Sequence, residues 1–112
     1  MRESRYLTNR AQYTLVYRQG KDWADRLLVM KAMPNGLNLS RYGFSVTKKV
    51  GKAVQRNRLK RLLREIMRLQ SLKRGWDIVF IVRSAAVNTD YYQLERAATK
   101  LLTRAQLLES SE

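Results

Sequence analysis

Apolar positions near the N-terminus recur with helical spacing. Over residues 9–19, the aromatic and aliphatic members of this pattern are three and four residues apart: Tyr13, Val16 and Tyr17. Side chains at this spacing share one face of a helix. We expect Thr8 to cap the start of the helix and Gly20 to close it at the C′ position. The pattern therefore predicts an amphipathic first helix.

Three later segments have the pattern of β-strands. Residues 27–33 and 76–82 form mostly apolar runs, and the second suits a central strand that is buried on both faces. Residues 42–48 instead alternate, with Tyr42, Phe44 and Val46 on one face and small residues on the other. This alternation predicts a strand that is covered on one side and closely approached on the other.

Two longer segments have helical periodicity. On a helix over about residues 52–70, one face collects the large apolar side chains: Leu59, Leu62, Leu63, Ile66 and Met67. A last helix begins after residue 88, with Thr89 or Asp90 as its N-cap. Its apolar stripe contains Leu94, Ala97, Ala98, Leu101, Leu102 and Ala105.

These elements predict one α+β domain over residues 1–112. We expect a single sheet of about four strands, one more than the three segments above, with helices packed on it, in the order α-β-β-β-α-β-α. No apolar run is long enough to span a bilayer, and the first ten residues lack the apolar core of a secretory signal. The absence of cysteine excludes disulfides and favours the cytoplasm.

Charge adds a functional indication to this fold. The chain has 23 Lys and Arg against nine Asp and Glu, for a net charge of +14. Residues 41–68 contain ten of the cations, and Glu65 is the only acid among them. Such clustering is typical of a nucleic-acid-binding protein. The alternative is a generally basic protein with a solvated face.

The helix at 52–70 concentrates this charge opposite its apolar face. Arg56, Lys60, Arg64 and Arg68 follow one another at i, i+4, where like charges repel and destabilise an isolated helix. Phosphates would supply the missing anions, and arginine binds them with a bidentate fork. Asn57 adds a group on this face that can bind a base or a sugar. A solvated face and an anionic membrane surface are the alternatives.

Catalytic residue types are missing from the chain. It has no histidine and no cysteine, and the aspartates that a magnesium nuclease would need are scattered: Asp22, Asp25, Asp77 and Asp90. No phosphate-binding loop motif is present. We therefore expect no catalytic residue, no metal site and no small-molecule cofactor on the protein itself.

The segment YGFSVTKKVGKAVQRNRLKRLLREIMR, with its central Arg-Asn-Arg, resembles the signature region of the bacterial ribonuclease P protein family. The resemblance continues through RAQYTLVYRQGKDWADRLLV, GWDIVFIVR and the last helix, and so covers almost the whole chain. It implies an RNA-binding subunit that assists a catalytic RNA in removing the 5′ leader of precursor tRNA. It also implies magnesium held mainly by that RNA, and a left-handed crossover between the strands at 42–48 and 76–82, although about 98% of such connections are right-handed.

The resemblance implies two binding surfaces. The family's motif positions, which meet the catalytic RNA, match Lys48, Lys49, Lys52, Arg56, Asn57, Arg58, Lys60, Arg61 and Arg64, and Arg68 continues the same basic face. The cleft that holds the single-stranded leader of precursor tRNA has counterparts in Tyr13, Tyr17, Arg26, Lys31 and Arg83. At Lys31 a charge replaces an aromatic residue of the family, so the family's leader preference does not transfer.

Alternatives follow from the residues alone. Aromatics among cations suit single-stranded RNA, but core packing would explain Tyr13 and Tyr17 equally well. A basic ribosomal or RNA-chaperone protein is the main functional alternative. A helix-turn-helix DNA-binding protein is a third, and the strands that flank the basic helix argue against it.

Overall fold

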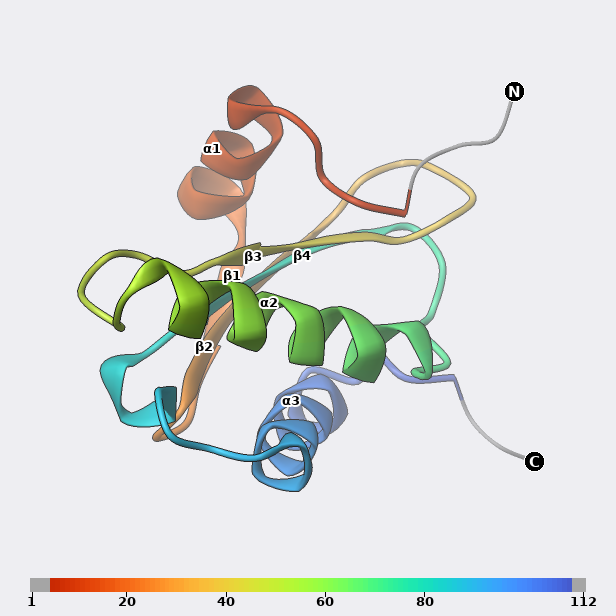
Figure 1. The fold of residues 1–112 in the computed structure, drawn as a ribbon. Helices are drawn as coiled ribbons and strands as arrows, with labels where there is room; N and C mark the ends of the chain where they lie inside the picture. The colour runs from red at the N-terminus through yellow and green to blue at the C-terminus, as the bar shows by residue number, and fades with distance from the viewer. Residues whose placement is uncertain (1–4, 110–112) are drawn as a thin grey trace.

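The computed structural model describes residues 5–109, and Figure 1 shows their arrangement. Within these residues the order of elements is the predicted α-β-β-β-α-β-α. The elements are α1 (Arg10–Gln19), β1 (Lys21–Ala24), β2 (Leu28–Pro34), β3 (Arg41–Ser45), α2 (Ala53–Arg68), β4 (Trp76–Val82), the 3₁₀ turn η1 (Ser84–Ala86) and α3 (Tyr91–Arg104). None of the helices in this part of the chain has the length and apolar character needed to cross a bilayer.

The four strands form one mixed sheet in the order β1-β2-β4-β3. Strand β2 pairs antiparallel with β1 and β4, whereas β3 and β4 are parallel. The chain joins the parallel pair through α2, and the path drawn in Figure 1 is the left-handed crossover that the resemblance implied. This connection places the whole length of α2 against one face of the sheet.

The helices form layers on both faces of the sheet. Helix α1 covers one face, while α2 and α3 lie together on the other (Figure 1). Residues of β4 alternate between the layers: Phe80 belongs to the main core with α2 and α3, and Val79 packs with Val16 of α1. Strand β4 is therefore buried on both faces, as the sequence predicted.

The predicted cap of α1 is wrong by one residue. Asn9, not Thr8, is the N-cap, because its side chain accepts a hydrogen bond from the Gln12 amide and the Gln12 side chain bonds back to the Asn9 amide. Gly20 ends the helix with extended geometry rather than in the left-handed conformation. A side chain at Gly20 would collide with the carbonyl oxygen of Val16. Glycine is thus required there by close approach.

The other predicted ends are close to those observed. Asp90 is the N-cap of α3, and its carboxylate accepts a hydrogen bond from the Gln93 amide at 2.8 Å. The buried stripe of α3 contains Leu94, Ala97, Ala98, Leu101 and Leu102, with Ala105 partly buried beside it. Tyr92 lies outside this stripe and is 66% exposed.

Candidate nucleic-acid interface

Helix α2 combines a buried apolar face with an exposed basic one. Leu59, Leu63, Ile66 and Met67 are at most 1% exposed, and each such side chain stabilises the fold by about 1.5–3 kcal/mol when fully buried. Leu62 lies at the edge and is half-buried. The opposite face, together with the preceding loop, forms what we call the α2 surface: Lys48, Lys49, Lys52, Asn57, Lys60, Arg61 and Arg64.

The side chains of the α2 surface form no hydrogen bond or ion pair with any described residue. No acid in this part of the chain therefore neutralises its cations. Lys60 is half-buried and the other six are exposed. Lys48 and Lys49 lie in the loop that enters α2, next to the end of β4, because the Ser84 hydroxyl donates to the Lys49 carbonyl oxygen. The surface therefore runs from the end of the sheet along most of α2.

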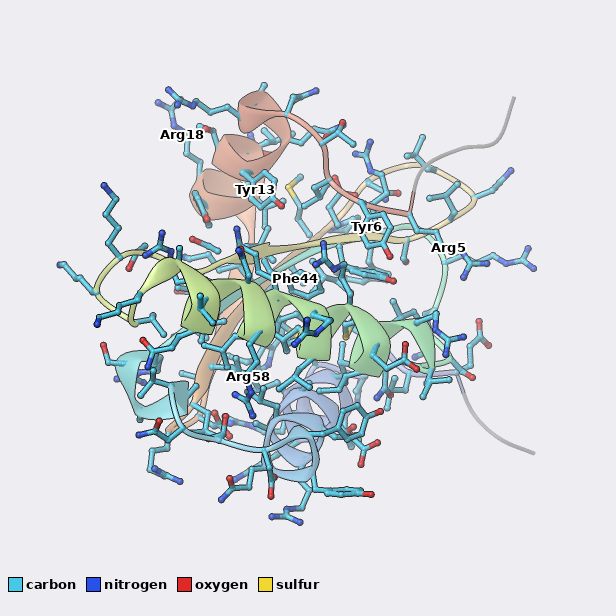
Figure 2. All side chains as sticks on the ribbon, viewed as in Figure 1. Arg5, Tyr6, Tyr13, Arg18, Phe44 and Arg58 are labelled. Carbon is cyan, nitrogen blue, oxygen red and sulfur yellow. The ribbon has the colours of Figure 1, made fainter. Side chains whose placement is uncertain are left out.

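Two predicted RNA-binding arginines of α2 point instead toward the protein. Arg56 donates to the Gly51 carbonyl oxygen at 2.8 Å, within its own helix N-terminus. Arg58 donates to the Thr89 carbonyl oxygen at 2.7 Å, and Figure 2 shows its side chain directed toward the α3 side of the molecule. Both guanidinium groups are half-buried. The Arg-Asn-Arg motif thus mixes structural contacts with one exposed amide, that of Asn57.

Arg68 ends the basic row of α2 and is already paired. Its guanidinium forms two hydrogen bonds with the Glu65 carboxylate, at 3.1 and 2.7 Å. The hydrogen bond from Arg68 lowers the pKa of Glu65 below its usual value and so favours the ionised carboxylate. Both side chains are exposed, so the pair adds little stability. It leaves the guanidinium accessible at the end of the helix.

The α1 side of the sheet carries three of the five predicted leader-binding residues, those at positions 13, 17 and 31. One row of paired positions crosses all four strands: Asp22, Lys31, Val79 and Gly43. Tyr13 lies directly over Gly43, where any side chain would overlap the Tyr13 ring. Figure 2 shows Tyr13 pointing from α1 toward the sheet. The small residue that the alternating pattern predicted at this position therefore makes room for an aromatic ring.

Tyr13 and Tyr17 form an aromatic pair on α1. Their ring centroids are 6.5 Å apart with planes tilted by 53°. Burial raises the pKa of the Tyr13 hydroxyl, and a backbone hydrogen bond at Phe44 opposes that rise. Tyr17 is 38% exposed and can accept a stacked base. Tyr13 thus partly packs, as the alternative reading held, while Tyr17 faces solvent.

Lys31 is held by an acid on the neighbouring strand. Its ammonium lies 2.8 Å from a carboxylate oxygen of Asp22, its register partner on β1. The Lys31 side chain is 20% exposed and that of Asp22 58%. The position that the sequence aligns with an aromatic residue of the family therefore carries an ion pair on the same sheet face as Tyr13.

Arg26 and Arg83 meet at the end of the sheet. They line one pocket, together with the short segments at residues 24–25 and 84–85. Arg83 donates to the Asp25 carbonyl oxygen at 3.1 Å. It lies two residues beyond Ile81, a residue of β4 that packs on the α1 side.

The four scattered aspartates have structural partners. Asp25 accepts hydrogen bonds from the amides of residues 27 and 28 and so caps that turn, and Asp90 caps α3. Asp77, 3% exposed, accepts two hydrogen bonds from Arg41 and one from Asn35. Asp22 pairs with Lys31. Across residues 5–109, no three acidic, His or Cys side chains come together in a way that could hold a metal ion.

Some exposed cations and aromatics near these surfaces were missed by the sequence analysis. Arg18, in the last turn of α1, is exposed and extends from the helix in Figure 2. Arg5 and Tyr6 lie beside the start of β3, where Tyr6 bridges to Tyr42. Arg5 and Tyr6 belong to no local motif, and only the fold brings these two residues near α2. For Arg18 the only signal in the sequence was its position directly after Tyr17, which a helix places about 100° away rather than on the same face.

Comparison with known proteins gives consistent results. The family model described as Ribonuclease P matches residues 1–106. The ribonuclease P protein component of Dehalococcoides mccartyi is 50% identical over 111 residues, covering 99% of this chain and 92% of that protein. That of Clostridium botulinum is 44% identical, covering 94% and 96%. The structure of the RNase P protein from Staphylococcus aureus has the same fold, with a TM-score of 0.88 and 27% identity, covering 96% of this chain and 100% of that one. The RNase P protein from Thermotoga maritima also has this fold, with a TM-score of 0.83 and 33% identity, covering 97% of this chain and 100% of that one.

Proposed function

The chain belongs to the ribonuclease P protein family, and from this premise we propose that its α2 surface binds the catalytic RNA while the α1 side of its sheet binds the leader of precursor tRNA. Membership makes the protein a subunit of the ribonucleoprotein endonuclease that processes tRNA 5′ ends. The assignment of residues to the two RNAs is our proposal.

The observation that carries the proposal is the row of cations without protein partners on α2. Lys60, Arg61 and Arg64 repel one another along the helix and find no neutralising acid among the described residues. The destabilisation that this repulsion causes is offset if phosphates supply the negative charge that carboxylates do not. Nearby Lys48, Lys49 and Lys52 extend the same surface, so a backbone of several phosphates could follow it.

The leader surface is supported by aromatic and basic residues on a different face. Tyr17 offers an exposed ring, Lys31 an ion-paired ammonium, and Arg26 and Arg83 cations at the end of β4. Stacking on aromatic rings contributes about 1–3 kcal/mol per base and tolerates any sequence, as binding of varied leaders requires. Two separate faces would let the protein hold the catalytic RNA and its substrate together.

Hydrolysis is assigned to the RNA partner. Because the described aspartates are engaged in structural contacts, we place the magnesium ions of the reaction on the RNA. The protein residues screen phosphate charge and position the precursor. We also propose that the complex works in the cytoplasm.

Reconstitution at low magnesium tests the proposal. The protein, mixed with a bacterial ribonuclease P RNA, should raise the rate of precursor-tRNA cleavage at magnesium concentrations where the RNA alone is slow. A parallel reaction without the catalytic RNA should give no cleavage. Failure to stimulate at any protein concentration would instead favour a basic ribosomal or RNA-chaperone role for this chain.

A variant of Tyr17 tests the leader surface within the same assay. Tyr17→Ala should weaken binding of precursor tRNA to the reconstituted enzyme by roughly 5- to 150-fold, the range of one lost base stack. Binding of mature tRNA, which has no leader, should not change. Equal losses for both RNAs would mean that Tyr17 only supports the fold.

A further inference from the structure

A pocket lies where the C-terminal end of α2 meets the segment before β3 and the start of the described chain. It has a volume of about 370 Å³, within the roughly 300–1,000 Å³ of ligand sites. Arg68 at its edge is also the last cation of the basic row on α2. An RNA that follows the α2 surface would therefore pass the mouth of this pocket.

The floor of the pocket is apolar and partly aromatic. Leu39 and Leu72 are half-buried and supply most of its accessible apolar surface, because Tyr42 and Met67, which also line it, are only 3% and 1% exposed. Tyr42 is fixed from the side by Tyr6, whose ring lies edge-on at a centroid distance of 5.2 Å. Such a floor favours a flat, weakly hydrated ring over a hydrated ion.

The rim of the pocket is basic. Arg5 and Arg74 are exposed and make no side-chain hydrogen bond or ion pair with any described residue, and Arg68 contributes a third guanidinium. Arg5 and Arg68 lie close enough to the Tyr42 hydroxyl to lower its pKa, although burial dominates and raises that pKa to about 12. Three arginines around one opening suit a phosphate.

Polar groups that can read a base edge complete the wall. Asn38 is exposed, and its amide has no hydrogen-bond partner among residues 5–109. Gln70 donates its amide nitrogen to the Thr99 hydroxyl at 3.2 Å, which fixes the side chain and leaves its oxygen as an acceptor. Glu109 adds a carboxylate that can accept from a base amino group.

We propose that this pocket binds one unpaired nucleotide of the catalytic RNA, with its base on the apolar floor at Leu39 and Leu72 and its phosphate at Arg5 and Arg74. The inference rests on the proposed function, because it requires RNA along α2. The nucleotide must be unpaired, since a base in a duplex cannot leave its stack to reach the floor. An acidic peptide would satisfy the arginines but would make no use of the apolar floor.

Site-directed cleavage locates the RNA. The chain has no cysteine, so a single introduced thiol can carry an iron–EDTA group that cuts nearby RNA. Leu37→Cys places this group beside the pocket, and Val54→Cys, at a residue that is 80% exposed, places it on α2. In the complex with the catalytic RNA, position 37 should cut around one or two unpaired nucleotides and position 54 at a separate site.

The two positions separate this inference from the proposed function. Cutting from position 54 without cutting from position 37 would overturn the pocket and leave the α2 surface standing. Cutting from neither position would overturn both. Cutting from position 37 within a continuous duplex would overturn the inference that the bound nucleotide is unpaired.

An RNA that lacks the base of the located nucleotide then tests whether that base enters the pocket. Replacing the located nucleotide by an abasic one should weaken binding of the wild-type protein by roughly tenfold. Asn38→Ala should weaken binding of the intact RNA but not of the abasic RNA. Equal affinity of wild-type protein for both RNAs would overturn insertion of the base.

A matched pair of cations tests the phosphate contact. Arg74→Ala should lower the slope of log affinity against log salt by about one, the change expected for one lost phosphate contact. Lys73→Ala removes the same charge one residue away, outside the pocket lining, and should change the slope by much less. Equal changes for the two variants would overturn a specific phosphate site at Arg74.

Discussion

At the scale of single residues, Arg58 shows how position in a motif and contact in the fold can differ. It is the second arginine of the Arg-Asn-Arg motif, and the family resemblance implied that its side chain meets the catalytic RNA. In the structure its guanidinium is half-buried and donates to the Thr89 carbonyl oxygen at 2.7 Å. Thr89 itself is 5% exposed and precedes the N-cap of α3. Arg58 therefore ties α2 to the start of α3.

Arg58→Ala is expected to act on stability and not on RNA affinity. Loss of a charged hydrogen bond that leaves the Thr89 carbonyl without its partner should lower the free energy of unfolding by about 1–3 kcal/mol. Urea denaturation measures this loss. The salt dependence of RNA binding by the folded variant should match that of the wild type. If the variant had normal stability but a reduced slope of log affinity against log salt, Arg58 would instead be an RNA-binding residue.

Gly43 and Tyr13 form a second informative contact. A Cβ atom at residue 43 would overlap the Tyr13 ring, which has β3 on one side and α1 on the other. Gly43→Ala should therefore destabilise the protein by about 1–3 kcal/mol, as overpacking does. In a Tyr13→Ala background the same substitution should cost much less, because the obstacle is gone. Additive effects in this double-mutant cycle would refute the contact.

At the scale of elements, α2 is the segment that the sequence described best. Its helical projection separated the buried Leu59, Leu63, Ile66 and Met67 from the exposed Arg61 and Arg64, because a 3.6-residue period holds along the whole helix. The projection could not reveal that Arg58 reaches α3, since a long side chain at the edge of a face can turn toward either side.

Other elements depended on information that is not local. The four-residue β1 has no alternating pattern, and only pairing with β2 identifies it. Residues 46–48 continue the strand pattern but lie beyond β3, which ends at Ser45 with its pairing to Ile81 of β4. The row from Asp22 to Gly43 arises from the register of four strands that are distant in sequence. No local pattern specifies that register or the left-handed crossover.

Substitutions on α2 test whether its exposed face meets phosphate. Arg61→Ala and Arg64→Ala should each weaken binding to the catalytic RNA and lower the log–log salt slope by up to about one. Both side chains are exposed and lack a partner among the described residues, so stability should change little. Arg96→Ala, which removes an exposed arginine from α3, serves as the control. Unchanged slopes for residues 61 and 64 would mean that water alone covers this face.

At the scale of the whole molecule, the charge is far from balanced. The chain carries a net charge of +14, while residues 5–109 contain three ion pairs, of which only Arg41–Asp77 buries its carboxylate. The α2 surface, the pocket at the C-terminal end of α2 and the Arg26–Arg83 end of the sheet all present cations to solvent. Repulsion among these groups lowers the stability of the free protein.

Polyvalent anions should therefore stabilise the folded protein. A ligand that binds only the folded state adds about 2.7 kcal/mol at a concentration of one hundred times its Kd. For a domain of this size that gain corresponds to a rise in Tm of roughly 10 °C or more. Thermal melts in pyrophosphate, compared with melts in sodium chloride at equal ionic strength, measure the part of the Tm rise that is due to specific anion binding. The rise should be smaller in an Arg61→Ala/Arg64→Ala double variant, because two cations of the α2 surface are gone. An equal rise in both salts would show general screening, and the cations would then act as independent solvated charges rather than as sites for phosphate.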